Sequence, residues 1–97
     1  MSREIKWSKR ATEEWVKILE YWIKRNKSYT YSLKLDRLLK DTLQLMDGHP
    51  ESSQMSDYPT VRVKTFRDYS IYYRAYSEDI EILSIRDSRR DPKKFKL

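Results

Sequence analysis

Alternation of apolar and polar residues is the strongest pattern in the chain, and it runs through residues 61–85. This period of two predicts β-strands, whose successive side chains point to opposite faces of a sheet. The short segments "FRD" and "SED" fit hairpin turns between three such strands. In the last strand, Ile80 and Ile82 are expected on one face, with Leu83 and Ile85 on the other. A strand that is apolar on both faces belongs inside its sheet.

The first half of the chain changes to helical spacing after a short strand. Residues 4–7 ("EIKW") alternate and predict that strand, and Ser8 follows it as a helix cap. Two apolar stripes then predict two helices, the second beginning near Tyr29. The stripes are Ala11, Trp15, Ile18, Leu19 and Trp22 in the first helix, and Leu35, Leu38, Leu39, Thr42, Leu43 and Met46 in the second. Gly48 is expected to end the second helix in a left-handed conformation, and Pro50 prevents its continuation.

These elements predict an α+β fold with the order β-α-α-β-β-β. The connection between the helices is short, so they should form an antiparallel hairpin. That hairpin is expected to cover one face of a small antiparallel sheet, with Tyr69 and Tyr73 packed beneath it. Residues 49–59 are polar, contain two prolines and are expected to form a loop. A length of 97 residues fits a single domain, 1–97.

Charge is distributed unevenly along the chain. Lys and Arg number 21 against 15 Asp and Glu, a net charge of +6, and the excess lies at the two ends. Such an excess favours a polyanion or an acidic protein partner, although ordinary solubilising charge is the simpler alternative. The absence of cysteine excludes disulfides, thiolate metal sites and a cysteine nucleophile, and we expect no metal or cofactor. No apolar run approaches the ~20 residues of a membrane helix, which predicts a cytoplasmic protein without membrane contact.

Four segments together resemble a known family. They are "IKWSKRATEEWVKILEYW", "HP", "VRVKTFRDYSIYY" and "IEILSIRDSRRDP", which follow one another over nearly the whole chain. Their order and spacing resemble toxins of the RelE/ParE superfamily from bacterial type II toxin–antitoxin pairs. The resemblance implies growth inhibition that a cognate antitoxin relieves by binding the toxin in a hetero-oligomer. It leaves the target open, because RelE-like members cut messenger RNA in the ribosome whereas ParE-like members poison DNA gyrase.

The residues that RNA cleavage requires are incomplete, which favours the ParE branch. Metal-free cleavage needs a base, cations and an acid close together. Arg62 and Lys64 match the paired basic positions of RelE-like enzymes and are expected on the outer face of the sheet. Ser70, however, stands where those enzymes commonly place Arg, and Phe95 stands where they place Tyr or His. The alternative is a RelE-like, metal-independent messenger RNA endonuclease whose catalytic residues are Arg62, Lys64, Arg86, Arg89 and Arg90. A further alternative is a non-toxic nucleic-acid-binding module.

Candidate binding residues lie on the strands and in the basic C-terminal run. Tyr72 and Arg74 should share the sheet face turned away from the helices, where a tyrosine can stack on a base or on a protein partner. The "RDSRRDP" run adds cations, unless Asp87 or Asp91 pairs an arginine in a structural turn. The predicted target-binding residues are Tyr72, Arg74, Arg86, Arg89 and Arg90. The predicted antitoxin-binding residues are Tyr29, Tyr31, Lys93 and Lys94.

Overall fold

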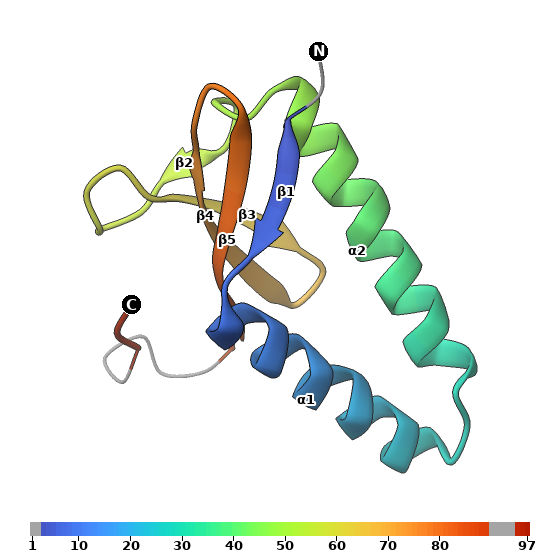
Figure 1. Cartoon of the computed structure of the whole chain (residues 1–97). Helices are drawn as coiled ribbons and strands as arrows, with labels where there is room; N and C mark the ends of the chain where they lie inside the picture. The colour runs from blue at the N-terminus through green and yellow to red at the C-terminus, as the bar shows by residue number, and fades with distance from the viewer. Residues whose placement is uncertain (1–2, 90–94) are drawn as a thin grey trace.

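The chain folds into a five-stranded sheet accompanied by two helices (Figure 1). A computed structural model describes residues 3–89 and 95–97. The elements in chain order are β1 (Glu4–Trp7), α1 (Lys9–Asn26), α2 (Thr30–Gly48), β2 (Gln54–Met55), β3 (Arg62–Phe66), β4 (Tyr69–Ala75) and β5 (Asp79–Asp87). The strand order across the sheet is β1-β5-β4-β3-β2. The predicted α+β class and the helical pair between the first strand and the later ones are confirmed.

The sheet is mixed rather than wholly antiparallel. β2, β3, β4 and β5 pair antiparallel with their neighbours, whereas β1 runs parallel to β5. β2 is a strand of two residues within the segment 49–59, which the sequence predicts as a loop. The two edge strands, β1 and β2, are both short. β5 lies between β1 and β4, so the part of β5 that pairs with β1 is paired on both sides.

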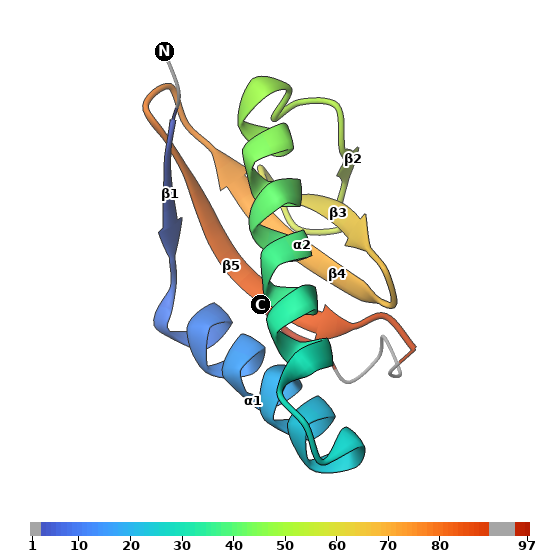
Figure 2. The same cartoon turned by 90° about the vertical axis from the view of Figure 1, so that its right-hand side faces the viewer.

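The two helices diverge from their connection and form a V (Figure 1). α2 crosses one face of the sheet, here called the inner face, while α1 lies beneath the end of the sheet (Figure 2). Ser8 caps α1 as predicted, because its hydroxyl accepts a hydrogen bond from the Ala11 amide at 3.0 Å. Lys27, at φ 52°, ends α1 in the left-handed region. Neither helix in the described part of the chain is long and apolar enough to cross a membrane.

Asp36 ties the two helices together. Its carboxylate accepts a hydrogen bond from Trp15 Nε1 at 2.9 Å and pairs with Lys40 Nζ at 2.8 Å. Burial alone raises the pKa of Asp36, but the hydrogen bonds from Lys40 and Trp15 outweigh burial and lower that pKa. The indole of Trp15 is thereby held at the junction of α1, α2 and the sheet.

The core lies between the helices and the inner face of the sheet. Its buried members are Ala11, Trp15, Leu35, Leu39, Leu43, Met46, Phe66, Tyr69, Ile71, Tyr73, Ile80, Ile82 and Ile85. Tyr69 and Tyr73 are 5% and 0% exposed, which confirms that they pack beneath the helices. Trp22 Nε1 donates to the Tyr69 hydroxyl at 2.8 Å, and the Tyr73 hydroxyl donates to the Pro50 carbonyl at 2.7 Å. Both buried hydroxyls are thus satisfied, which removes a desolvation cost.

One extra residue in β5 changes which of its side chains face the core. Residues 72–73 of β4 pair with Ser84 and Ile82, so Leu83 has no partner on β4. Such a bulge shifts the alternation of the strand by one residue. Ile85 therefore lies on the same inner face as Ile82 and is fully buried. The prediction that placed Ile85 on the opposite face is wrong for this reason.

α2 ends without the left-handed glycine that the sequence predicts. Gly48 is the last helical residue, and its φ is not positive. The Arg3 guanidinium donates to the Asp47 carbonyl at 3.1 Å, and the Arg3 amide donates to Asp47 Oδ1 at 2.7 Å. The His49 amide donates to the Met46 carbonyl at 3.1 Å. A cation near the start of the chain and a tight last turn therefore satisfy this helix end.

Replacing Leu39 by Ala tests the register of α2. Leu39 is 0% exposed, so the truncation should lower the free energy of unfolding by about 2–5 kcal/mol. Leu45, on the same helix, is 76% exposed, and Leu45→Ala should change that free energy by less than about 0.5 kcal/mol. Chemical denaturation of both variants measures the difference. Equal midpoints for the two variants would contradict the register.

Candidate functional site

The outer face of the sheet, defined as the face turned away from α2, carries tyrosine and arginine side chains. Residues directly opposite each other on antiparallel strands share a face. Ser70 pairs with Arg86 and Arg74 pairs with Glu81, so residues 70, 72 and 74 of β4 lie with Arg86 on the outer face. The Arg74 guanidinium is fixed by donation from Nε to Thr60 Oγ1 at 3.0 Å. Three predicted target-binding residues lie on this face: Tyr72, Arg74 and Arg86.

Arg62 and Lys64 lie on the inner face instead. Their partners on β4 are core residues, so their side chains leave the sheet on the side of α2. Arg62 Nη1 donates to two carbonyls of the segment 51–53, at 3.1 and 2.8 Å. The prediction that placed both cations outward is wrong because Phe66, two residues beyond Lys64, packs into the core and fixes the alternation of β3. β3 instead presents Val63 to the outer face.

The ring of Phe95 covers the outer face at Tyr72 and Arg86. Its centroid lies 4.6 Å from that of Tyr72, with 31° between the ring planes, and the Arg86 guanidinium carbon lies 4.5 Å from the Phe95 centroid. Tyr58 meets the ring edge-on at 6.1 Å, and the Arg10 guanidinium carbon lies 5.3 Å from its centroid. These separations suit aromatic and cation–π attraction. We call Arg10, Tyr58, Tyr72 and Arg86 the ring socket.

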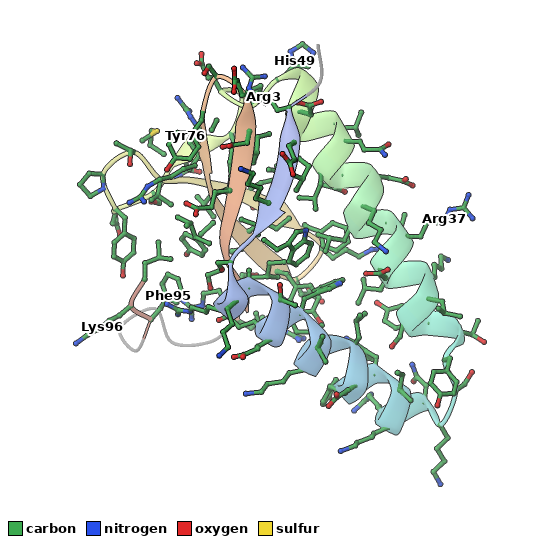
Figure 3. The ribbon with its side chains drawn as sticks, in the orientation of Figure 1. Arg3, Arg37, His49, Tyr76, Phe95 and Lys96 are labelled. Carbon is green, nitrogen blue, oxygen red and sulfur yellow. The ribbon has the colours of Figure 1, made fainter. Side chains whose placement is uncertain are left out.

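The backbone of residues 95–97 is held at the same place. Arg10 Nη1 donates to the Lys96 carbonyl at 2.6 Å. The Tyr58 hydroxyl donates to the Phe95 carbonyl at 3.3 Å and accepts from the Leu97 amide at 3.2 Å. Figure 3 shows Phe95 and Lys96 close to the beginning of α1. A cavity of about 250 Å³ adjoins the Phe95 ring and the short strand β2. The C-terminal residues thus fold over part of the candidate site.

A second hollow, of about 460 Å³, lies between α1 and the end of β5. Arg89 on its rim donates to both carboxylate oxygens of Asp87, at 3.0 and 2.8 Å. This hydrogen bonding, together with the charge of Asp87, raises the pKa of Arg89. Burial raises the pKa of the Tyr69 hydroxyl in the same hollow, while the hydrogen bond from Trp22 opposes the shift. Arg89 therefore forms an ion pair with Asp87, which is the structural alternative that the sequence leaves open for this basic run. Arg90 lies outside the described residues.

The outer face presents guanidinium groups and tyrosine rings. Guanidinium groups and tyrosine rings bind anionic and aromatic groups through charge and stacking. The only histidine of the chain, His49, lies at the end of α2 and points away from Phe95 (Figure 3). Within residues 3–89 and 95–97 no cluster of three His, Asp or Glu side chains offers a metal site.

The sequence matches a family model described as "ParE toxin of type II toxin-antitoxin system, parDE" over residues 5–92. The chain belongs to this ParE toxin family. No curated protein matches it. The membership agrees with the branch of the RelE/ParE superfamily that the incomplete cleavage residues favour.

Two solved structures share the fold of this ParE-type toxin. One is the "Chromosomal ParDE TA system from P. aeruginosa", with 19% identity, coverage of 89% of this chain and 96% of that chain, and a TM-score of 0.75. The other is the "intact E. coli RelBE toxin-antitoxin complex", with 18% identity, coverage of 92% and 100%, and a TM-score of 0.55. Both likenesses extend over nearly the whole chain, so the shared fold includes both helices and the sheet.

The predicted antitoxin-binding residues of this ParE-type toxin have different environments. Tyr29 is 68% exposed at the start of α2. Tyr31 is half-buried, and its ring meets that of Trp22 edge-on at a centroid distance of 4.9 Å. Tyr29 is therefore available to a partner, whereas Tyr31 already takes part in the packing of α1 against α2. Lys93 and Lys94 lie outside the described residues.

Three residues at the ring socket carry no clear signal in the sequence: Arg10, Tyr58 and Phe95. Arg10 looks like an ordinary surface cation of a helix, and Tyr58 lies in a segment read as a loop. Phe95 stands where RelE-like enzymes place Tyr or His, and that position does not indicate a contact with the sheet. The one available signal is that Phe95 is an apolar residue within a basic run, which a solvated tail does not require.

Glu14 of α1 takes the place of a strand partner at the edge of β5, beside the candidate site. β1 pairs with β5 only as far as Ile82, and beyond that point Glu14 Oε1 accepts hydrogen bonds from Ser84 Oγ at 2.8 Å and the Ile85 amide at 3.2 Å. Ser84 is fully buried, so its hydroxyl depends on this carboxylate. One side chain of α1 thus satisfies the edge of β5 and fixes the helix relative to the strand that carries Arg86.

Glu14→Ala should leave the Ser84 hydroxyl and the Ile85 amide without this acceptor. The expected loss is about 1–3 kcal/mol in the free energy of unfolding. Glu13→Ala is the matched control, because Glu13 is an exposed carboxylate one residue away. Denaturation midpoints of the two variants give the comparison. A stability loss of the same size for Glu13→Ala would contradict the role assigned to Glu14.

Proposed function

We propose that this ParE-type toxin inhibits bacterial growth by acting on DNA gyrase through the outer face of its sheet, in the cytoplasm. The observation that supports gyrase as the target is that the cations lie on two different faces of the sheet. Arg62 and Lys64 lie on the inner face, whereas Arg86 lies on the outer face. Cleavage of RNA without a metal requires cations, a base and an acid around one phosphate. The separation supports a toxin that binds its target over one that cleaves RNA.

The outer face has the side chains that protein partners recognise. Tyrosine and arginine are enriched among the residues that dominate protein–protein binding. Tyr72 and Arg74 lie two residues apart on β4, and Arg86 of β5 lies opposite Ser70, next to Tyr72 on the same face. We assign these three residues to target contact. Arg89 contributes less in this proposal, because Asp87 already engages its guanidinium.

We further propose that a cognate antitoxin neutralises the toxin in a hetero-oligomer by covering its helices. Large apolar side chains are exposed along both helices and their connection: Val16, Tyr21, Tyr29, Leu33 and Leu45. An extended or helical segment that folds on binding can cover such dispersed residues. The two structures with the same fold are described as a ParDE system and a RelBE toxin–antitoxin complex, which supports a partner of this kind. Tyr29 and Tyr31 are the proposed apolar contacts, with Lys93 and Lys94 meeting acidic groups.

Inducible expression with separate readouts distinguishes the possible targets. We expect growth arrest with gyrase-linked DNA breaks, while messenger RNA remains intact and translation continues at first. A purified translation system and a purified gyrase cleavage assay repeat the comparison in vitro. Rapid cleavage of ribosome-bound messenger RNA would identify a RelE-like endonuclease instead. Normal growth with nucleic-acid binding would identify a non-toxic binding module.

Paired substitutions on the two faces of the sheet test the assigned surface. Arg74→Ala should weaken target binding about tenfold or more and reduce toxicity, because it removes a cation from the outer face. Lys64→Ala removes a half-buried cation from the neighbouring strand on the inner face and should leave toxicity unchanged. Growth assays at matched protein levels, with circular dichroism to verify folding, provide the measurement. Loss of toxicity with Lys64→Ala alone would favour the cleavage mechanism.

A further inference from the structure

The residues assigned to target contact are partly occupied by the chain itself. Phe95 stacks on Tyr72 and lies under the guanidinium of Arg86. A partner that uses Tyr72 and Arg86 therefore needs the space that the Phe95 ring fills. Arg74, in contrast, is anchored to Thr60 away from the ring. The surface is thus divided into an open part and a part covered by residues 95–97.

The covering segment is not part of the hydrophobic core. All buried core residues lie on the inner side or in the helices, and none comes from residues 95–97. Lys96 and Leu97 are exposed, and Phe95 is only half-buried. Displacement of this segment leaves the core contacts in place. The fold therefore does not require the segment to stay docked.

The contacts described for residues 95–97 are accessible to water and individually weak. Arg10, which donates to the Lys96 carbonyl, is exposed and also contacts Glu14 at 3.4 Å. The hydrogen bonds between Tyr58 and the backbone of residues 95–97 are 3.3 and 3.2 Å long. Aromatic and cation–π contacts of a half-exposed ring are individually weak. Such a set favours the docked position modestly and leaves it reversible.

We propose that residues 95–97 form an autoinhibitory latch that competes with the target for Tyr72 and Arg86. The inference rests on the proposed use of the outer face for target binding, and it adds a regulatory equilibrium to it. In the closed state Phe95 fills the ring socket. In the open state the Phe95 ring no longer covers the outer face at Tyr72 and Arg86, and gyrase can approach this part of the face. The apparent affinity for the target then equals the intrinsic affinity multiplied by the open fraction.

Fluorine NMR of the free toxin measures the docked state directly. The chain has two phenylalanines, Phe66 and Phe95, so incorporation of 4-fluorophenylalanine gives two resonances. Phe95→Ala assigns them by deleting one. We expect the Phe95 resonance to be displaced from that of the free amino acid by the stacked Tyr72 ring. Arg10→Ala should move it toward the free value, whereas Lys9→Ala, which removes a neighbouring exposed cation, should not.

The affinity of the same proteins for purified gyrase shows whether weakening the closed state strengthens target binding. Arg10→Ala and Phe95→Ala should raise the apparent affinity roughly two- to tenfold, because each removes contacts of the closed state. Lys9→Ala should bind like the unmodified toxin. Addition of gyrase to the unmodified toxin should shift the Phe95 resonance toward its undocked value. Arg10→Ala tests the latch without altering Phe95 or the residues beneath it.

The outcomes separate the latch from the proposed function. If gyrase binds while the Phe95 resonance stays docked, or if both Arg10→Ala and Phe95→Ala bind more weakly, the segment belongs to the binding surface and the latch is refuted. A Phe95 resonance at the free value in the unmodified toxin also refutes it. If the unmodified toxin does not bind gyrase, the proposed function fails, and the latch as a competitor for gyrase fails with it.

Discussion

The edge of β5 is the constraint on which the rest of the structure depends. β1 pairs with this strand only through Ile82, and the beginning of α1 then takes over. The Ser8 hydroxyl donates to the Leu83 carbonyl at 2.9 Å, and Glu14 accepts from Ser84 and Ile85. A buried strand cannot leave these polar groups unpaired without a cost of several kcal/mol, on the order of 1–3 for each. One helix terminus is therefore locked to the central sheet.

That locking determines the geometry of the candidate site. The turn of α1 that holds Glu14 against β5 also carries Arg10, which reaches the Phe95 ring and the Lys96 carbonyl. β5 carries Arg86, whose guanidinium carbon lies 4.5 Å from the centroid of the same ring. The outer face is thus assembled by elements from both ends of the chain, whereas α2 and the core lie behind it. The proposed binding surface and the hydrophobic core therefore lie on opposite faces of one sheet.

Sequence periodicity predicted the elements well and the faces less well. β1 and the cap at Ser8 follow directly from alternation and capping chemistry. Ile85 faces the core only because a bulge at Leu83 shifts the alternation of β5 by one residue. The alternation of apolar and polar residues in the sequence does not reveal such a bulge. Arg62 faces inward because Phe66, at the other end of β3, packs into the core and thereby fixes which side chains of the strand face inward. The return of Phe95 to the sheet is a tertiary contact between distant segments, which local patterns do not encode.

The outer face of the sheet is the surface that we propose meets the target. A photo-crosslinking residue at position 65, which is exposed on this face opposite Ser70, tests it directly in cells that lack the antitoxin. The same residue at position 45, exposed on α2, is the control. The account predicts a crosslink to a gyrase subunit from position 65 and none from position 45. Crosslinks from position 65 to ribosomal proteins, or to gyrase only from position 45, would contradict it.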